Sequence, residues 1–135
     1  MHLNSDLGKF SLRLSLGGLL ILHGYHKLVH GFDGVIHLLT AKGLPAFFWI
    51  GVPFAEIIAP VFLLLGIFTR ISSTLIVFMM LMTIYLAMGF SSFEFNQMGG
   101  LNGELNFLYL FAAIAILFIG PGKYRIATLT SKWLV

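Results

Sequence analysis

Cysteine and charge are what this sequence has least of. Its 135 residues include no cysteine, which excludes disulfide bonds, thiolate metal ligands and thiol redox chemistry carried by the chain itself. Charged residues make up 10% of the chain, whereas a soluble domain has about 25%. With 59% hydrophobic residues and a mean hydropathy of +0.97, the composition is that of an integral membrane protein. Any redox chemistry therefore needs a bound cofactor or a partner.

Other absences exclude further function classes. The net charge of +3 depends on only 8 basic residues, and no basic stripe with interleaved exposed aromatics is present, so we expect no nucleic-acid partner. No nucleotide-binding motif and no haem-ligand spacing occurs. The first apolar run has no small-residue cleavage pattern after it, so we expect a retained membrane span and not a signal peptide.

Four apolar runs predict an all-α polytopic membrane protein, a four-transmembrane-helix bundle formed by a single domain over residues 1–135. Each run is close to the roughly 20 residues that a bilayer requires. The predicted spans are about residues 10–30, 46–68, 71–88 and 102–119. A less apolar stretch over residues 32–44 predicts a short helix at the membrane interface. Close helix packing is predicted by glycines seven residues apart, Gly17, Gly24 and Gly31.

The basic residues predict how the chain is oriented. Four spans place both termini and the turn between spans two and three on one side of the membrane. That side holds six basic residues: Lys9, Arg13, Arg70, Lys123, Arg125 and Lys132. The opposite side holds Lys42 and the near-membrane Lys27. By the positive-inside rule, we predict a multi-pass protein of the cell inner membrane with cytoplasmic N- and C-termini.

Ionisable residues of three spans are predicted to lie at one depth. At a rise of 1.5 Å per residue, Lys27, Glu56 and Glu104 are each roughly 21 to 24 Å from the cytoplasmic edge. Pro60 cannot donate to the carbonyl of Glu56, which leaves a free acceptor at that residue. We predict that Lys27 pairs with Glu56, Glu104 or both in the outer half of the bilayer. Nearby we expect His23, His26, Asn102 and Asn106.

Several interpretations of these residues stay open. Charged residues inside a membrane are usually functional, which favours ligand binding or proton handling, but a structural ion-pair network is the alternative. In the functional interpretation Glu56, Glu104 and Lys27 are catalytic, and the ligand-binding residues are His23, His26, His30, Asn102 and Trp49. Imidazoles at helical spacing suit a metal, but Lys27 among them repels cations, so we expect none. Either an interfacial belt or a wall that stacks on a quinone is formed by the aromatics Phe47, Phe48, Trp49, Phe90, Phe93 and Phe95.

Short motifs follow one another along nearly the whole chain. They are His23-Gly24-Tyr25-His26-Lys27-Leu28, Gly43-Leu44-Pro45, Glu56, Gly66-Ile67-Phe68-Thr69-Arg70, Glu104 and Gly120-Pro121-Gly122-Lys123-Tyr124. Their order and spacing resemble the DoxX family of small four-helix membrane proteins. That family includes a small subunit of thiosulfate:quinone oxidoreductase, so the resemblance implies a membrane subunit of a quinone-linked oxidoreductase with quinone as its cofactor. Many relatives have a histidine late in span three, where this chain has Ile84-Tyr85-Leu86.

Two other functions compete with this one. The chain is alternatively a non-catalytic membrane anchor or scaffold that recruits redox enzymes through its loops. A small-solute carrier is the third interpretation, favoured by intramembrane carboxylates but requiring a homo-oligomer because the chain is small. The partners we expect are membrane lipids, a soluble or membrane-bound redox protein, and further copies of the chain.

Overall fold

A computed structural model describes residues 4–126, which form an all-α fold, and Lys132 lies outside this range. The first helix, α1 (Ser5–His30), begins after Asn4, whose side chain accepts a hydrogen bond from the backbone of Leu7 at 3.1 Å. Such a cap satisfies one of the free donors at a helix start. The short α2 (Asp33–Ala41) follows, as predicted for the stretch before span two.

The second predicted span is one helical stretch of changing pitch. It consists of the 3₁₀ turn η1 (Ala46–Ile50), α3 (Gly51–Pro53), the π turn η2 (Phe54–Ile58) and α4 (Ala59–Leu65). Prolines lack a backbone N–H and so interrupt the regular α-helical hydrogen bonding. The π turn lies between Pro53 and Pro60, and Glu56 is inside it.

The third and fourth predicted spans are also helical. After Gly66, which ends α4 in the left-handed conformation, α5 (Thr69–Thr83) continues into the π turn η3 (Ile84–Met88) and the 3₁₀ turn η4 (Gly89–Phe93). An irregular segment over 94–103 leads to α6 (Glu104–Ile119), which ends at Gly120 with a φ of 75°.

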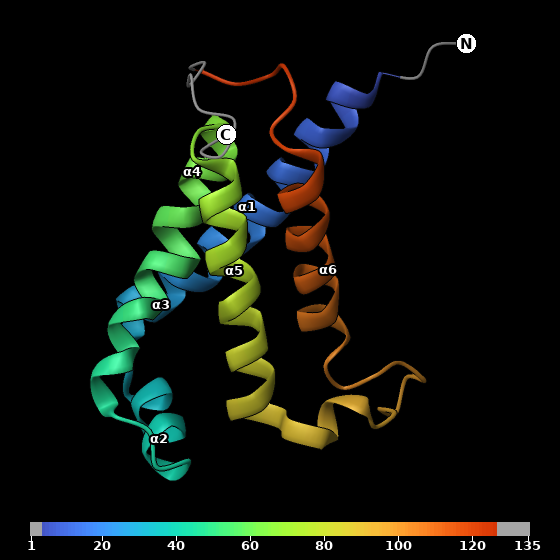
Figure 1. Cartoon of the computed structure of the whole chain (residues 1–135). Coiled ribbons are helices and arrows are strands. Elements are labelled where there is room, and N and C mark those ends of the chain that lie inside the picture. The colour runs from blue at the N-terminus through green and yellow to red at the C-terminus, as the bar shows by residue number, and fades with distance from the viewer. Residues whose placement is uncertain (1–3, 127–135) are drawn as a thin grey trace.

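Four helices form the bundle (Figure 1): α1 contacts α4 and α6, and α5 contacts the same two helices. Small residues let α1 and α4 approach closely, since a Cβ atom at Gly17 would lie 3.0 Å from the carbonyl oxygen of Pro60. The core contains apolar side chains from all four helices: Leu16, Leu20, Ala59, Leu63, Ile76, Met80, Leu110, Ala113 and Ile116. Gly17 and Gly24 thus pack as the seven-residue spacing predicts, whereas Gly31 lies beyond the end of α1.

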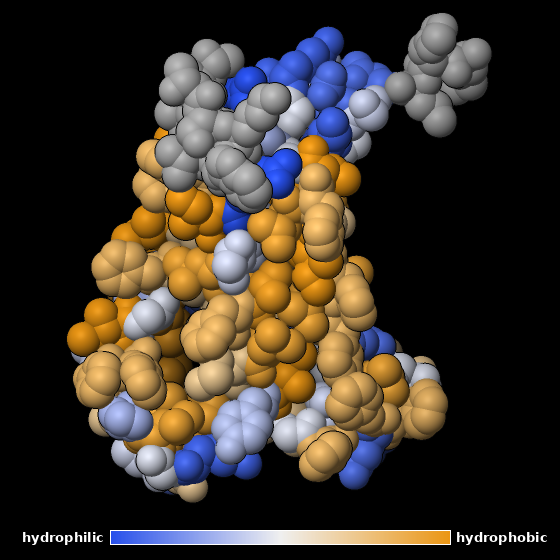
Figure 2. All heavy atoms as spheres, in the orientation of Figure 1, coloured by the Kyte–Doolittle hydropathy of each residue, from blue (hydrophilic) through white to orange (hydrophobic). Residues whose placement is uncertain are grey.

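The surface has the polarity expected of a protein in a bilayer. Apolar side chains cover the middle of the visible face, and hydrophilic residues gather at its two ends (Figure 2). Within the described residues, two helical stretches are long and apolar enough to cross a membrane, Ala46–Leu65 and Thr69–Phe93. The apolar α6 is shorter, at 16 residues, and α1 carries Arg13 and Lys27 within its length. The four-span topology therefore stays a prediction.

Candidate functional site

Lys27 of α1 and Glu56 of the π turn η2 form an ion pair. Lys27 Nζ donates to Glu56 Oε1 across 2.6 Å, so one of the alternatives predicted for Lys27 is present. Glu56 is 3% exposed, and its second oxygen, Oε2, has no hydrogen-bond partner among the described residues. Since a buried oxygen without a partner costs free energy, this atom is available for a proton or a further donor.

Gly24 brings α1 against the backbone of Glu56. A Cβ atom at Gly24 would lie 2.8 Å from the carbonyl oxygen of Glu56 and 2.6 Å from Cγ1 of Ile57. This is the carbonyl that Pro60 leaves without its usual intrahelical donor. The glycine, one turn before Lys27, therefore lets the two helices come close enough for the ion pair.

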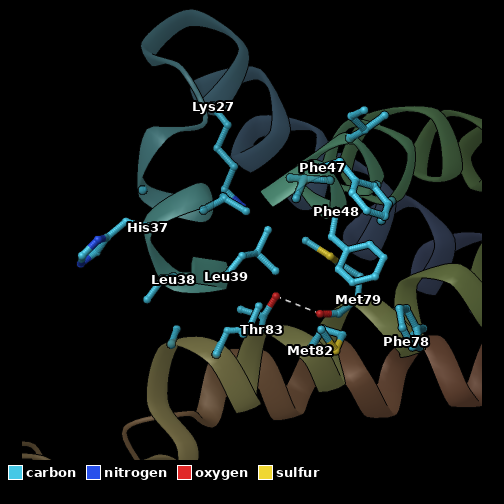
Figure 3. A pocket seen from close by; sticks show the side chains of 18 of the residues that line it. Lys27, His37, Leu38, Leu39, Phe47, Phe48, Phe78, Met79, Met82 and Thr83 are labelled. Carbon is cyan, nitrogen blue, oxygen red and sulfur yellow. Dashed lines mark hydrogen bonds between the residues drawn. The ribbon is translucent and has the colours of Figure 1, made fainter. Parts of the chain in front are cut away.

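A cavity of about 920 Å³ opens beside Lys27. Its walls come from the end of α1, from α2, from η1 and α3, and from one face of α5 (Figure 3). Most lining side chains are apolar, among them Leu39, Phe48 and Met79. The volume is near the upper end of the range of about 300 to 1,000 Å³ that is usual for small-molecule sites.

Lys27 is the one lining residue with a permanent charge in the part of the chain that the structure describes. Figure 3 shows its side chain extending into the space between α2 and α5, whereas the ring of His37 points away from that space. An ammonium group has three N–H donors, and Glu56 accepts one of them. The side chain of Lys27 is 29% exposed, so a donor is available to a carbonyl or anionic oxygen in the cavity.

Glu104 is not brought to Lys27. It is exposed at the start of α6, and its carboxylate turns back against Gly100 of the preceding loop. The side chains of two neighbouring asparagines contact the turns before this loop. Asn102 Nδ2 donates to the carbonyl of Ser91 at 3.0 Å, and Asn106 Nδ2 lies 3.9 Å from Met88 Sδ. The expectation that Glu104 and the two asparagines surround Lys27 is corrected, because their side chains contact the loop and its flanking turns.

The histidines divide between two places. His23 Nε2 lies 3.5 Å from the hydroxyl of Tyr109 on α6. His26 and His30 stack on each other with ring centroids 4.2 Å apart, and both are exposed. His23 and His26 were expected around the ion pair, but the side-chain contacts of their rings are with Tyr109 and His30 and not with Lys27 or Glu56. Among the described residues no group of three or more metal-ligating side chains is arranged to hold an ion.

The aromatic residues also divide into two sets. Phe47 and Phe48 line the cavity. Trp49 packs on Phe32 with ring centroids 5.0 Å apart and is not among the lining residues. Phe90, Phe93 and Phe95 are exposed at the η4 end and are likewise outside the cavity lining. Among the described residues, the phenylalanines that can stack on a ligand in the cavity are therefore Phe47 and Phe48 of η1 and Phe78 of α5.

Arg13 is a buried cation that the sequence-based interpretation treated only as an orientation marker. It is 1% exposed and makes five hydrogen bonds to four backbone carbonyls, those of Leu63, Leu64, Pro121 and Tyr124. These carbonyls belong to the end of α4 and to the segment after α6. An arginine inside a predicted span with no carboxylate at its depth is the signal that points to such backbone partners.

A model of the DoxX family matches residues 8–89. The chain belongs to the DoxX family. In this DoxX protein the matched region includes α1 through η3, and so contains Lys27, Glu56 and the cavity walls, while Glu104 lies outside it. DoxX is a membrane family, in agreement with the apolar helices. No curated protein and no solved structure matches the chain significantly.

Proposed function

We propose that this DoxX protein binds a quinone beside Lys27 and serves as the membrane subunit of a quinone-linked oxidoreductase of the thiosulfate:quinone type. The single observation that carries the proposal is the apolar cavity of about 920 Å³ with one ammonium group in its wall. A flat, mostly apolar ring with carbonyl oxygens matches that lining, whereas a small inorganic anion would leave most of the apolar space unfilled.

The proposed topology has four spans, in the inner membrane, with both termini in the cytoplasm. It is supported by contacts at one end of the bundle. There Lys123 N donates to Asp6 of the first turn of α1 at 3.2 Å, and Ile126 N donates to the carbonyl of Leu65 at 3.0 Å. The start of α1, the end of α4 and the segment after α6 thus lie together, as an even number of crossings requires. Most of the basic residues are at this end, which the positive-inside rule assigns to the cytoplasm.

The chain's own residues suit proton and hydrogen-bond chemistry. A bound quinone supplies the capacity to accept two electrons and two protons. Lys27 donates a hydrogen bond to a carbonyl oxygen in the cavity while Glu56 Oε1 holds the ammonium in place. Glu56 Oε2, which has no hydrogen-bond partner in the described part of the chain, takes or gives a proton behind Lys27. Electrons come from a partner protein or from a reductant bound beside the quinone, because the chain has no cysteine.

The test is equilibrium binding of a short-tailed quinone to the purified protein in lipid nanodiscs. We expect saturable binding that Lys27→Met weakens about tenfold to a hundredfold, the effect of losing one charge-assisted hydrogen bond. Lys123→Met removes a cation at the opposite end of the bundle and should leave the affinity unchanged. Absence of saturable binding to correctly folded wild-type protein would reject the quinone site and favour the anchor function.

A further inference from the structure

A second apolar hollow, of about 330 Å³, lies next to the quinone cavity. It is lined by residues of η2, α4 and α5 together with Phe68, and none of the described lining residues is ionisable. Leu75 of α5 lines both the hollow and the cavity. The two spaces therefore meet at one side chain.

The spacing of the lining residues shows that both spaces follow one seam between helices. On α5 the second hollow is lined by Ile71, Ser72 and Leu75, and the cavity continues from Leu75 with Phe78, Met79, Met82 and Thr83. These positions are three or four residues apart, so they share one helix face. The helical stretch that faces α5 shows the same division. Its residues Val52 and Ala55 line the cavity, and Ile58 and Phe62, farther along the chain, line the hollow.

The chemistry changes along this seam. Lys27 supplies a cation at the cavity end, whereas the hollow at the other end is apolar apart from Ser72. From Leu86 at the cavity to Ile71 at the hollow, the seam is about 22 Å long at 1.5 Å per residue. A ligand that fills it has a polar head at Lys27 and an extended apolar part that passes Leu75.

We propose that the ligand carries a long isoprenoid or alkyl tail, and that this tail passes Leu75 and lies in the second hollow. This inference rests on the proposed quinone site and specifies the class of quinone. It excludes a tail-less, water-soluble reductant as the ligand that fills the seam. Leu75 is the residue that separates the space for the head from the space for the tail, so its size determines whether a long tail gains affinity.

The experiment compares two quinones with the same ring, one with a methyl group in place of the tail and one with a long isoprenoid tail. Both are dosed as mole fractions of the same lipid nanodiscs, so partitioning into lipid cancels when variants are compared with wild type. For wild type we expect the long-tailed quinone to bind at least tenfold more tightly. Leu75→Trp should lower the affinity for the long-tailed quinone more than that for the methyl quinone, which it also affects because Leu75 lines the quinone cavity.

Two further variants keep the test decisive. Ile71→Trp fills the hollow from its rim, where Ile71 is 51% exposed and outside the quinone cavity. It should remove most of the advantage of the long tail, even if Leu75→Trp does not fold, and leave the affinity for the methyl quinone within twofold. Leu81→Trp is the matched control, because Leu81 is on α5 but outside both spaces and 52% exposed. It should change neither affinity.

The possible outcomes distinguish a wrong tail path from a wrong quinone site. If the methyl quinone binds at Lys27 but the long tail gives no advantage, or if both quinones respond equally to Ile71→Trp, the tail path is wrong and the quinone site stands. If neither quinone binds to wild type, both are wrong. A phospholipid that native mass spectrometry finds on the wild type and not on Ile71→Trp, with unchanged quinone affinities, would overturn the tail path in favour of a lipid acyl chain.

Discussion

Arg13 and Lys27 are two cations on the same helix with opposite surroundings. Arg13 is fully buried, and its five hydrogen bonds to backbone carbonyls leave it no free donor direction toward a cavity. Within residues 4–126, the side chain of Lys27 has one protein acceptor, Glu56 Oε1, and borders a cavity of about 920 Å³. A cation whose N–H groups are all hydrogen-bonded within the protein stabilises the fold. A cation that has free N–H donors beside an apolar cavity can bind a ligand.

The comparison between the two cations is tested first at Arg13, where we expect the largest loss of stability. Arg13→Ala removes five hydrogen bonds to four backbone carbonyls, of which that of Leu63 keeps a second donor in Gly66 N, at a cost of about 3 to 5 kcal/mol. Arg13→Lys should recover only part of this loss, since one ammonium cannot reach both segments as the guanidinium fork does. Reversible unfolding in mixed detergent micelles measures the change.

Lys9→Ala is the control for Arg13. Lys9 is at the same end of α1 and forms a partly exposed ion pair with Asp6 at 3.9 Å, so its loss should cost at most about 1 kcal/mol. If Arg13→Ala proved as mild as Lys9→Ala, the carbonyls would have found other donors, and the contrast with Lys27 would lose its basis.

A smaller effect is expected at Lys27. Lys27→Met leaves the buried carboxylate of Glu56 without its cation and should cost about 2 to 3 kcal/mol, less than for a fully buried pair because Lys27 is 29% exposed. Lys27→Met/Glu56→Met replaces the pair by apolar groups and should restore most of the stability. Unfolding and quinone binding are measured on the same samples.

This double variant separates structural from functional roles at the pair. Stability should return while quinone binding does not, because the donor to the ligand is still missing. Recovery of both properties would mean that the ion pair only fixes the position of α1 against η2, as the structural interpretation holds.

The smallest of the three effects concerns the glycine that permits the pair. Gly24→Ala places a Cβ atom 2.8 Å from the carbonyl oxygen of Glu56, and the helices must separate, at about 1 to 2 kcal/mol. Gly18→Ala is the matched control, since no atom lies within 4 Å of a Cβ there, and it should be neutral or slightly stabilising. Equal thermal midpoints for the two variants would show that close approach at Gly24 does not matter.

How much of the site could be predicted depends on what can be learned from counting residues along a helix. The rise per residue gives depth, and it placed Lys27 and Glu56 at one level correctly. Depth does not give the direction of a side chain at a helix end, which is why Glu104, at the first position of α6, contacts Gly100. His26 was misplaced for a related reason, since its ring stacks on that of His30 at the surface.

The fold was more predictable than the site. Runs of apolar residues located the helices to within a few residues, because length and hydropathy suffice for that. Hydropathy does not predict the π turns η2 and η3 or the backbone partners of Arg13. These features depend on which backbone atoms lack hydrogen bonds once the helices pack together. Pro53 and Pro60 indicate where free carbonyls arise, but the position of the neighbouring α1 decides how they are covered.

The contacts of Arg13 also have a consequence for the order of biosynthesis. A ribosome adds Arg13 early and adds Tyr124, one of its acceptors, 111 residues later. Until α6 is in place, the guanidinium has only the α4 carbonyls of Leu63 and Leu64 as partners. A nascent chain that stops before Pro121 therefore lacks the acceptors of three of the five hydrogen bonds of Arg13, so the arginine is fully paired only once the last segment has been made.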